Sequence, residues 1–151
     1  MKKDLGVQPY LFPMPTYMIG TYNEDDSVDV MMMAWGGICD MKMVALNLEE
    51  DHKTVTNLKE RMAFTLAVPG TDTLVESDYL GLVSANKDPR KFEHTGLHAY
   101  KSANVDAPVI EEYPLHAFTF DQMRSGYYAV GEKIGMAWNA GAPIVKKSRE
   151  K

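Results

Sequence analysis

The chain divides its apolar residues into short strand-like segments that never alternate regularly with helices. Residues 17–22 and 28–34 predict two strands joined by a polar turn, and residues 41–48 predict a third. Further strand-like stretches follow at 63–68, near Ala99, near Val109 and Ile110, at 118–120 and at 127–130. A parallel sheet needs a crossover, usually a helix, between neighbouring strands. The pattern therefore predicts an antiparallel, mainly β domain, closed as a small barrel that protects its strand edges.

Two short helices are predicted between these strands. Residues 53–62 place Val55, Leu58 and Met62 on one apolar stripe. A second helix is expected to begin at Thr73, because Thr73 and Glu76 have the spacing of a capping box. Its expected buried face consists of Val75, Tyr79, Leu82 and Val83. The length of 151 residues, without a repeat or a clear linker, predicts a single domain over residues 1–151.

Composition argues against several classes of partner. The formal net charge of −5 is unfavourable for binding a nucleic-acid backbone. No apolar run approaches the ~20 residues of a membrane helix, and the basic N-terminal residues precede no apolar signal region. Cys39 is the single cysteine, so no disulfide can form within the chain. We expect a soluble, cytoplasmic protein with no nucleic-acid partner and no membrane partner.

The histidines do not predict a metal site. His94 and His98 have the i, i+4 spacing of a helical zinc pair, but Thr95 and Gly96 between them disfavour a helix. No cysteine pair or carboxylate completes a ligand set, so we predict no metal. The sequence also lacks a Gly-x-Ser-x-Gly elbow and a Walker loop, which leaves no support for a hydrolase or a nucleoside triphosphatase.

The start of the first predicted helix has the features of an anion site. A helix N-terminus offers free N–H groups and the positive end of the helix dipole. Lys53 adds a full positive charge there, and Thr54 adds a hydroxyl donor. The alternative is that Lys53 is a solvated lysine and Thr54 a helix cap. The residues alone leave both interpretations open.

Three segments in register resemble the flavin reductase-like, or flavoredoxin, family. They are residues 33–40 (MAWGGICD), 52–58 (HKTVTNL) and 84–92 (SANKDPRKF), and residues 131–135 (GEKIG) resemble the last strand and turn of the family. In order and spacing the match covers nearly the whole chain. The resemblance implies an antiparallel split β-barrel of the FMN-binding type, with two or more short helices and non-covalently bound FMN.

The resemblance also implies a set of cofactor-binding residues. The predicted set is Met33, Ala34, Trp35, Gly36, Gly37, His52, Lys53, Thr54, Asn57, Ser84, Asn86, Lys91 and Phe92. In it the segment at Trp35 borders the isoalloxazine ring, where glycines allow close approach of the backbone. Lys91 and Phe92 are candidates for a site shared with a dimer mate. The alternatives are a core aromatic followed by a glycine bulge, and a simple turn from Asn86 to Pro89.

The implied function is that of a redox flavoprotein. We expect an FMN-dependent oxidoreductase, either a flavin reductase or a flavoredoxin-like electron-transfer protein, that forms a homodimer and exchanges electrons with a small-molecule or protein partner. A nicotinamide donor, NAD(P)H, would bind transiently over the flavin, since no dinucleotide fingerprint is present. Cys39 is the candidate catalytic residue, because a thiolate can pass electrons between a flavin and a disulfide-like substrate. Its alternative role is that of a small buried hydrophobe.

Two rival functions stay open at the level of sequence. One is a non-catalytic module that keeps a flavin or ligand pocket without turnover. The other is an oligonucleotide-binding barrel, which the acidic charge disfavours.

The sequence departs from the family between Leu115 and Phe118. Relatives continue there with two further strands and an acidic helical insertion, whereas Leu115 leads here almost directly into residues 118–120. The barrel is therefore expected to lack one part. We predict either a break in the chain between Pro114 and Phe118 or a direct crossover that leaves the barrel open on that side.

Overall fold

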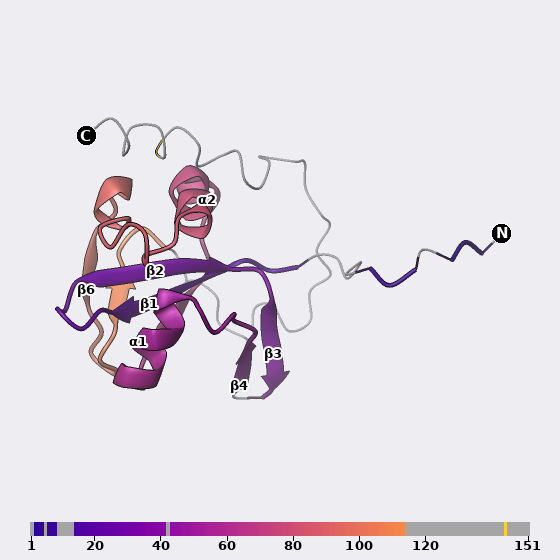
Figure 1. The fold of residues 1–151 in the computed structure, drawn as a ribbon, viewed down its shortest axis with the longest axis horizontal. Helices are drawn as coiled ribbons and strands as arrows, with labels where there is room; N and C mark the ends of the chain where they lie inside the picture. The colour runs from indigo at the N-terminus through magenta and orange to yellow at the C-terminus, as the bar shows by residue number, and fades with distance from the viewer. Residues whose placement is uncertain (1, 5, 9–13, 42, 114–143, 145–151) are drawn as a thin grey trace.

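The computed structural model describes residues 2–4, 6–8, 14–41, 43–113 and 144 (Figure 1). Within these residues the elements follow one another as β1 (Tyr17–Tyr22), β2 (Val28–Met33), β3 (Gly36–Asp40), β4 (Met43–Leu46), α1 (Lys53–Arg61), β5 (Thr65–Ala67), α2 (Leu74–Leu82), β6 (Ala99–Lys101) and β7 (Pro108–Ile110). Short 3-10 turns, η1 (Thr71–Thr73) and η2 (Glu93–Thr95), precede and follow α2. No helix among the described residues has the length and apolar character to cross a membrane.

Every strand pairing in the described part of the chain is antiparallel, which confirms the predicted strand arrangement. Strands β2, β1 and β5 form one sheet in that order, while β3–β4 and β6–β7 are separate hairpins. The β1–β2 register runs without a bulge from Tyr17 opposite Met33 to Tyr22 opposite Val28. These strands do not close a barrel within the described residues. The gap predicted between Pro114 and Phe118, and the segments 118–120, 127–130 and 131–135, lie outside them.

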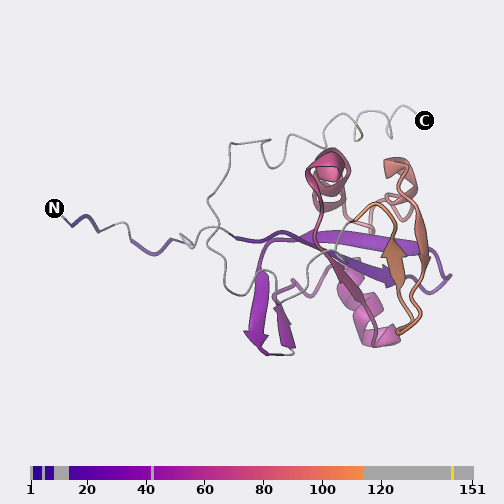
Figure 2. The same cartoon turned by 180° about the vertical axis from the view of Figure 1, so that it is seen from behind.

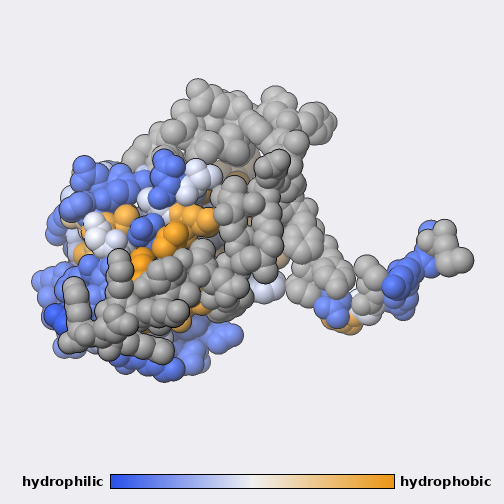
Figure 3. All heavy atoms as spheres, turned by 90° about the horizontal axis from the view of Figure 1, so that it is seen from above, coloured by the Kyte–Doolittle hydropathy of each residue, from blue (hydrophilic) through white to orange (hydrophobic). Residues whose placement is uncertain are grey.

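The two helices lie on opposite sides of the β1–β2 strands (Figures 1 and 2). Gly81 lets α2 approach β2 closely, because a Cβ at this position would lie 2.7 Å from the Cε atom of Met32 and 3.1 Å from its Cβ atom. The core between these elements is formed by Met18, Val30, Tyr79, Leu80, Phe92, Ile110 and Tyr113. On the side of α2 the surface carries a band of hydrophobic side chains between hydrophilic ones (Figure 3).

The bounds of α1 match the prediction, but its predicted buried stripe is wrong. Val55 and Leu58 are only partly buried, and Met62 ends the helix at φ 53° with 86% of its surface exposed. The buried residues are Thr54 and Asn57. Buried polar groups are tolerated when they are hydrogen-bonded, and these two bond to the strands beneath them. The apolar periodicity therefore marked the wrong face of this helix.

The polar face of α1 is tied to the β1–β2 hairpin. The Asn57 amide donates to Thr21 Oγ1 at 3.1 Å and to Asn23 Oδ1 at 2.9 Å. One turn further along, the Arg61 guanidinium donates to the Asn23 carbonyl oxygen and to Asp26 Oδ1. Hydrogen bonds are directional, so these contacts fix the orientation of α1 as well as its distance from the sheet.

The second helix also differs from its prediction. Thr73 stands at the N-cap of α2, but its hydroxyl donates to the Gly70 carbonyl oxygen at 3.2 Å and makes no cap bond. The predicted capping box is therefore wrong. Of the predicted buried face only Tyr79 is fully buried, and Val75 is 38% exposed. The buried residues are Ser77, Asp78, Tyr79 and Leu80, because this helix packs on more than one side.

The predicted third strand, residues 41–48, corresponds to β4, and the structure has an additional strand before it. Residues 36–40 form β3, which pairs with β4 in a hairpin. Gly36 is required by this pairing, since a Cβ there would lie 2.6 Å from the Ala45 carbonyl oxygen. The sequence did not predict β3, because two consecutive glycines weaken a strand by propensity.

The buried Tyr113 makes the stability of the fold depend on pH in the alkaline range. Burial raises the pKa of this phenol from its ordinary 10.0 to about 12, while the hydrogen bond from Ser77 acts in the opposite direction. A group with a raised native pKa contributes stability that is complete below its unfolded pKa and is lost as the pH rises toward the native value.

We predict that the free energy of unfolding falls by up to about 2–3 kcal/mol between pH 10 and pH 12 because of Tyr113. Tyr113→Phe should lose this part of the pH dependence, and Tyr100→Phe, which removes an exposed phenol, should keep it. Urea unfolding at several pH values measures the difference. Equal slopes for wild type and Tyr113→Phe would contradict the assignment.

We predict that Asn57→Ala lowers the free energy of unfolding by about 1–3 kcal/mol, because it leaves buried polar partners unsatisfied. Thr56→Ala removes an exposed side chain from the same helix and should change stability little. Urea titration of both variants is the measurement. An equally large fall in the free energy of unfolding of Thr56→Ala would point to helix propensity as the cause.

Candidate functional site

Most of the predicted cofactor-binding residues gather around one cavity of about 450 Å³, within the usual size range of cofactor pockets. From the predicted set this cavity is lined by Met33, Ala34, Trp35, His52, Lys53, Thr54, Ser84 and Lys91. They come from the end of β2, the start of α1 and the loop after α2, so the fold joins three segments that are distant in sequence. A second cavity of about 400 Å³, between β1, β5 and the β6–β7 hairpin, contains none of the predicted residues.

The start of α1 has no side-chain cap, although the Val55 and Thr56 N–H groups donate to the His52 carbonyl oxygen at 3.0 and 3.3 Å. His52 occupies the N-cap but makes no side-chain cap bond among the described residues, and the first turn carries no acidic residue. An acidic side chain would normally compensate the positive end of the helix dipole. Lys53 instead adds positive charge, and it borders both the 450 Å³ cavity and an adjoining polar hollow. An anion is the ligand that this helix end favours.

The hydroxyl of Thr54 is not free for such an anion. Thr54 Oγ1 donates to Asp29 Oδ2 at 2.6 Å, in a fully buried contact. A hydroxyl has one proton to donate, so Thr54 bonds to β2 rather than capping the helix or donating to a ligand. The predicted hydroxyl contact of Thr54 is therefore wrong in this conformation, whereas its place in the cavity wall stands.

Lys91 is a buried cation in the same wall. Its Nζ donates to the Leu80 carbonyl oxygen at 3.2 Å and to the Val83 carbonyl oxygen at 3.1 Å, and lies 3.6 Å from Asp29 Oδ1. Burial lowers the pKa of this ammonium, and the charge of Asp29 opposes that effect. Lys91 lines the cavity within a single chain, and its predicted sharing with the site of a dimer mate stays a prediction.

The remaining predicted residues lie outside the cavity for identifiable reasons. Asn57 is engaged with β1 and the following turn, and Phe92 belongs to the hydrophobic core. Asn86 borders the polar hollow next to Lys53, where its amide donates to the Asp51 carbonyl oxygen at 2.7 Å. Gly36 is constrained by its pairing with β4. A Cβ placed on Gly37 would meet no atom within 4 Å, so no steric contact of the fold demands glycine there.

Cys39 lies away from the cavity, on β3. Its side chain is exposed and the cysteine is free. The β3–β4 hairpin projects from the sheet (Figures 1 and 2), and Cys39 is not among the residues that line the cavity. The alternative of a buried small hydrophobe is wrong, because the thiol faces solvent.

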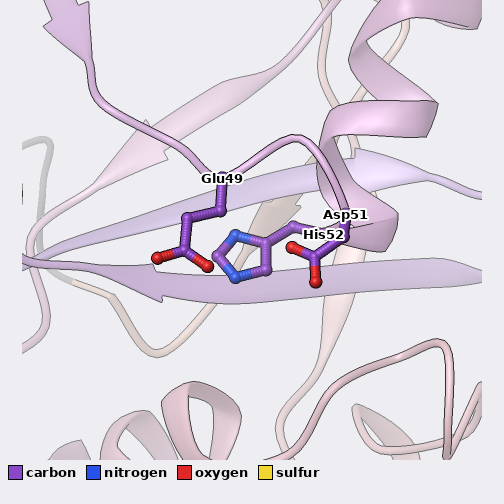
Figure 4. A group of neighbouring side chains, drawn as sticks. All are labelled: Glu49, Asp51 and His52. Atoms are coloured by element: carbon purple, nitrogen blue, oxygen red, sulfur yellow. The ribbon is translucent and has the colours of Figure 1, made fainter.

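A group of possible metal ligands lies on the turn before α1. Glu49 and Asp51 flank the His52 ring (Figure 4), and one ligand atom from each lies within 4.8 Å of the others. Both carboxylates are exposed. The two histidines weighed in the sequence have separate partners: His94 Nδ1 lies 3.1 Å from Asp88 Oδ2, and His98 Nδ1 lies 2.7 Å from Glu112 Oε1.

The cavity fits a ligand that is anionic at one end and flat at the other. Among the described residues, the Nδ1 atom of His52 is buried without a hydrogen-bond partner at the cavity wall. Such a group costs free energy unless a water or a ligand completes it. Lys53 and the open start of α1 supply positive charge beside it, and the half-exposed Trp35 offers an aromatic surface. These residues fit a flavin with a phosphate tail.

Sequence reasoning missed several residues that line this cavity or lie directly behind its wall. Asp29 stands between two valines, an alternation typical of a solvent-facing strand position, yet it is 1% exposed. Asn47, Leu48 and Glu49 line the cavity because the chain returns along it from β4 to α1. For Asp29, a charged residue inside a predicted strand was the available signal.

Comparisons with known proteins agree with this site. The model of the flavin reductase like domain family matches residues 10–119, well over half of the chain. No curated protein sequence gives a significant match. Among solved structures, the flavoredoxin of Desulfovibrio vulgaris (Miyazaki F) is similar over 93% of this chain and 100% of that chain, with 27% identity and a TM-score of 0.73.

Two further solved structures share the fold at lower identity. An FMN-binding domain of a flavin reductases-like enzyme from Shewanella baltica OS155 is 22% identical, covers 66% of this chain and has a TM-score of 0.61. A flavoredoxin from Methanosarcina acetivorans is also 22% identical, covers 74% and has a TM-score of 0.63. The chain spans 53% and 60% of the lengths of these two proteins.

The comparisons confirm the fold class of an antiparallel split barrel with short helices and support a flavin-binding redox role. They also confirm the resemblance carried by residues 33–40, 52–58 and 84–92. The chain belongs to the flavin reductase-like domain family.

Proposed function

We propose that this protein binds FMN non-covalently in the 450 Å³ cavity and works as a flavin reductase or a flavoredoxin-like electron carrier. The observation that carries the proposal is the convergence of three family segments on one cavity whose edge is an uncapped helix start. The flavoredoxin of Desulfovibrio vulgaris supports it as the relative covered over its whole length. The Shewanella baltica domain, described as FMN-binding, supports the choice of FMN.

In this proposal the protein positions the cofactor and sets its electrostatic surroundings. The N–H groups at the start of α1, with Lys53 and His52, would hold the phosphate. Trp35, which lines the cavity and is half-exposed, would cover the ring. The flavin supplies the electron transfer. A nicotinamide donor, NAD(P)H, would approach over the exposed side of the ring, and the cavity walls would exclude bulk water from the other side.

We predict that Lys53→Ala weakens FMN binding by about 1.5–3 kcal/mol, the range of a charge-assisted hydrogen bond. Riboflavin, which lacks the phosphate, should bind wild type and variant alike. Lys59→Ala removes an exposed lysine from the other end of the same helix and serves as the control. Quenching of flavin fluorescence measures both ligands. Loss of riboflavin affinity with unchanged FMN affinity would sink the phosphate assignment.

Colour separates the redox function from passive binding. A purified sample should absorb in the yellow flavin bands, bleach on addition of a reductant and recover in air. A coloured protein that does not bleach and recover would favour a non-catalytic flavin-binding module. A colourless protein that takes up no added FMN would refute flavin binding.

We also propose that the protein is a homodimer and that the β3–β4 hairpin lies in its interface. An isolated two-stranded hairpin is marginally stable in water, and this one exposes Ile38 at 70%, Met41 at 89% and Val44 at 42%. Its apolar surface continues into Trp35, which lines the cavity. A second copy seated on the hairpin would cover these side chains and close the open side of the cavity.

We predict a sedimenting species of about twice the 16.9 kDa chain mass at micromolar concentration. Ile38→Asp should shift it toward the monomer, because a buried unpaired charge opposes association. Val75→Asp introduces the same charge at an exposed position on α2 and should leave the dimer intact. A monomeric wild type that still binds FMN would count decisively against the proposal.

A further inference from the structure

A buried carboxylate lies directly behind the cavity wall. Asp29 on β2 is 1% exposed, and it does not itself line the cavity. One of its oxygens, Oδ2, accepts the hydrogen bond from Thr54 at the start of α1. The other, Oδ1, has no hydrogen-bond donor among the described residues and lies 3.6 Å from the Lys91 ammonium. Thr54 and Lys91 both line the cavity.

Lys91 is the buried positive charge that this carboxylate opposes. Its side chain is 3% exposed, and two of its three N–H groups are held by the carbonyl oxygens of Leu80 and Val83. Those carbonyls fix the position of the ammonium but carry only partial charges. Asp29 is the carboxylate that pairs with the ammonium, and the charge of Asp88 acts on it more weakly. The cavity wall therefore contains the Lys91 cation, and the negative charge of Asp29 largely cancels the electric field of this cation in the cavity.

We propose that Asp29 is a positioning residue that sets the affinity of the cavity for the flavin phosphate. It does so in two ways: it anchors Thr54 and with it the first turn of α1, and it neutralises Lys91. This inference rests on the proposed function. Without Asp29, Lys91 would be an uncompensated buried charge in the ligand-free protein, which is strongly destabilising. With Asp29, the empty cavity is stable, and the attraction for an anionic ligand is weaker than Lys91 alone would give.

The size of the effect follows from Coulomb's law. Two unit charges roughly 8 to 16 Å apart at an effective dielectric constant near 20 interact strongly enough to change a binding constant by about five- to thirty-fold. Charges in a buried wall are screened little by salt. Removing the Asp29 charge should therefore be visible in the affinity for FMN, and the neutral end of riboflavin should not respond to it.

The test compares FMN with riboflavin in isosteric variants. Asp29→Asn retains an oxygen that can accept from Thr54 but removes the negative charge. It should bind FMN about five- to thirty-fold more tightly while riboflavin affinity changes less than about threefold. Lys91→Met should weaken FMN binding by a similar factor, again with riboflavin nearly unchanged. Asp72→Asn, an exposed carboxylate in η1, is the control and should change neither affinity.

A structural role alone predicts a different result. If Asp29 only supports the fold, Asp29→Asn should lower the affinity for FMN and the affinity for riboflavin by similar factors, and that outcome overturns the inference. Should Asp29→Asn fail to fold, the double variant Asp29→Asn with Lys91→Met carries the test, since neither charge remains. Its FMN affinity should return to within about threefold of wild type, and an affinity no better than that of Lys91→Met overturns the inference. A wild-type chain that binds riboflavin and FMN equally refutes the phosphate site, and one that binds neither refutes the proposed function itself.

Discussion

The buried contact between Asp29, Thr54 and Lys91 is the constraint on which the rest of the site depends. It joins β2 to the first turn of α1 through one carboxylate oxygen and to the loop after α2 through the other. Lys91 in turn holds the last carbonyls of α2. These are the elements that enclose the cavity. A buried charge is tolerated only when it is paired and hydrogen-bonded, so the three walls must keep their distances for the fold to be stable.

A second set of polar contacts explains how the orientation of α1 is fixed. Its inner face at Thr54, Asn57 and Arg61 is hydrophilic and bonds to β2 and to the β1–β2 turn. Apolar burial is not directional, whereas hydrogen bonds weaken steeply when they are misaligned. A helix held in this way has a fixed axis, so its N-terminal end keeps its place at the cavity wall.

The sequence predicted what local signals determine. Strand β1, the start of β2 and the bounds of α1 follow from alternation, turn residues and helical spacing over a few neighbours. The buried face of α1 did not follow, because Asn57 is buried only through partners 34 and 36 residues away. Asp29, which lies behind the cavity wall, was missed for the same reason, since its partners Thr54 and Lys91 are brought to it by the tertiary fold. Family segments located the cavity, but they could not separate Lys91, which lines it, from Phe92, which belongs to the core.

The burial of each charged group determines how strongly it acts on a ligand in the cavity. Glu49 and Asp51 lie near its mouth and would repel a phosphate, but both are exposed, and exposed charges interact through water and are screened by salt within about 8–10 Å. The helix dipole acts only over its first turn. Lys91 and Asp29 act through the protein interior, where the effective dielectric constant is several times lower and little salt enters. In the proposed site, the discrimination between a phosphorylated and an unphosphorylated ligand would therefore depend on Lys53 and on the balance of the buried pair, rather than on the carboxylates on the surface.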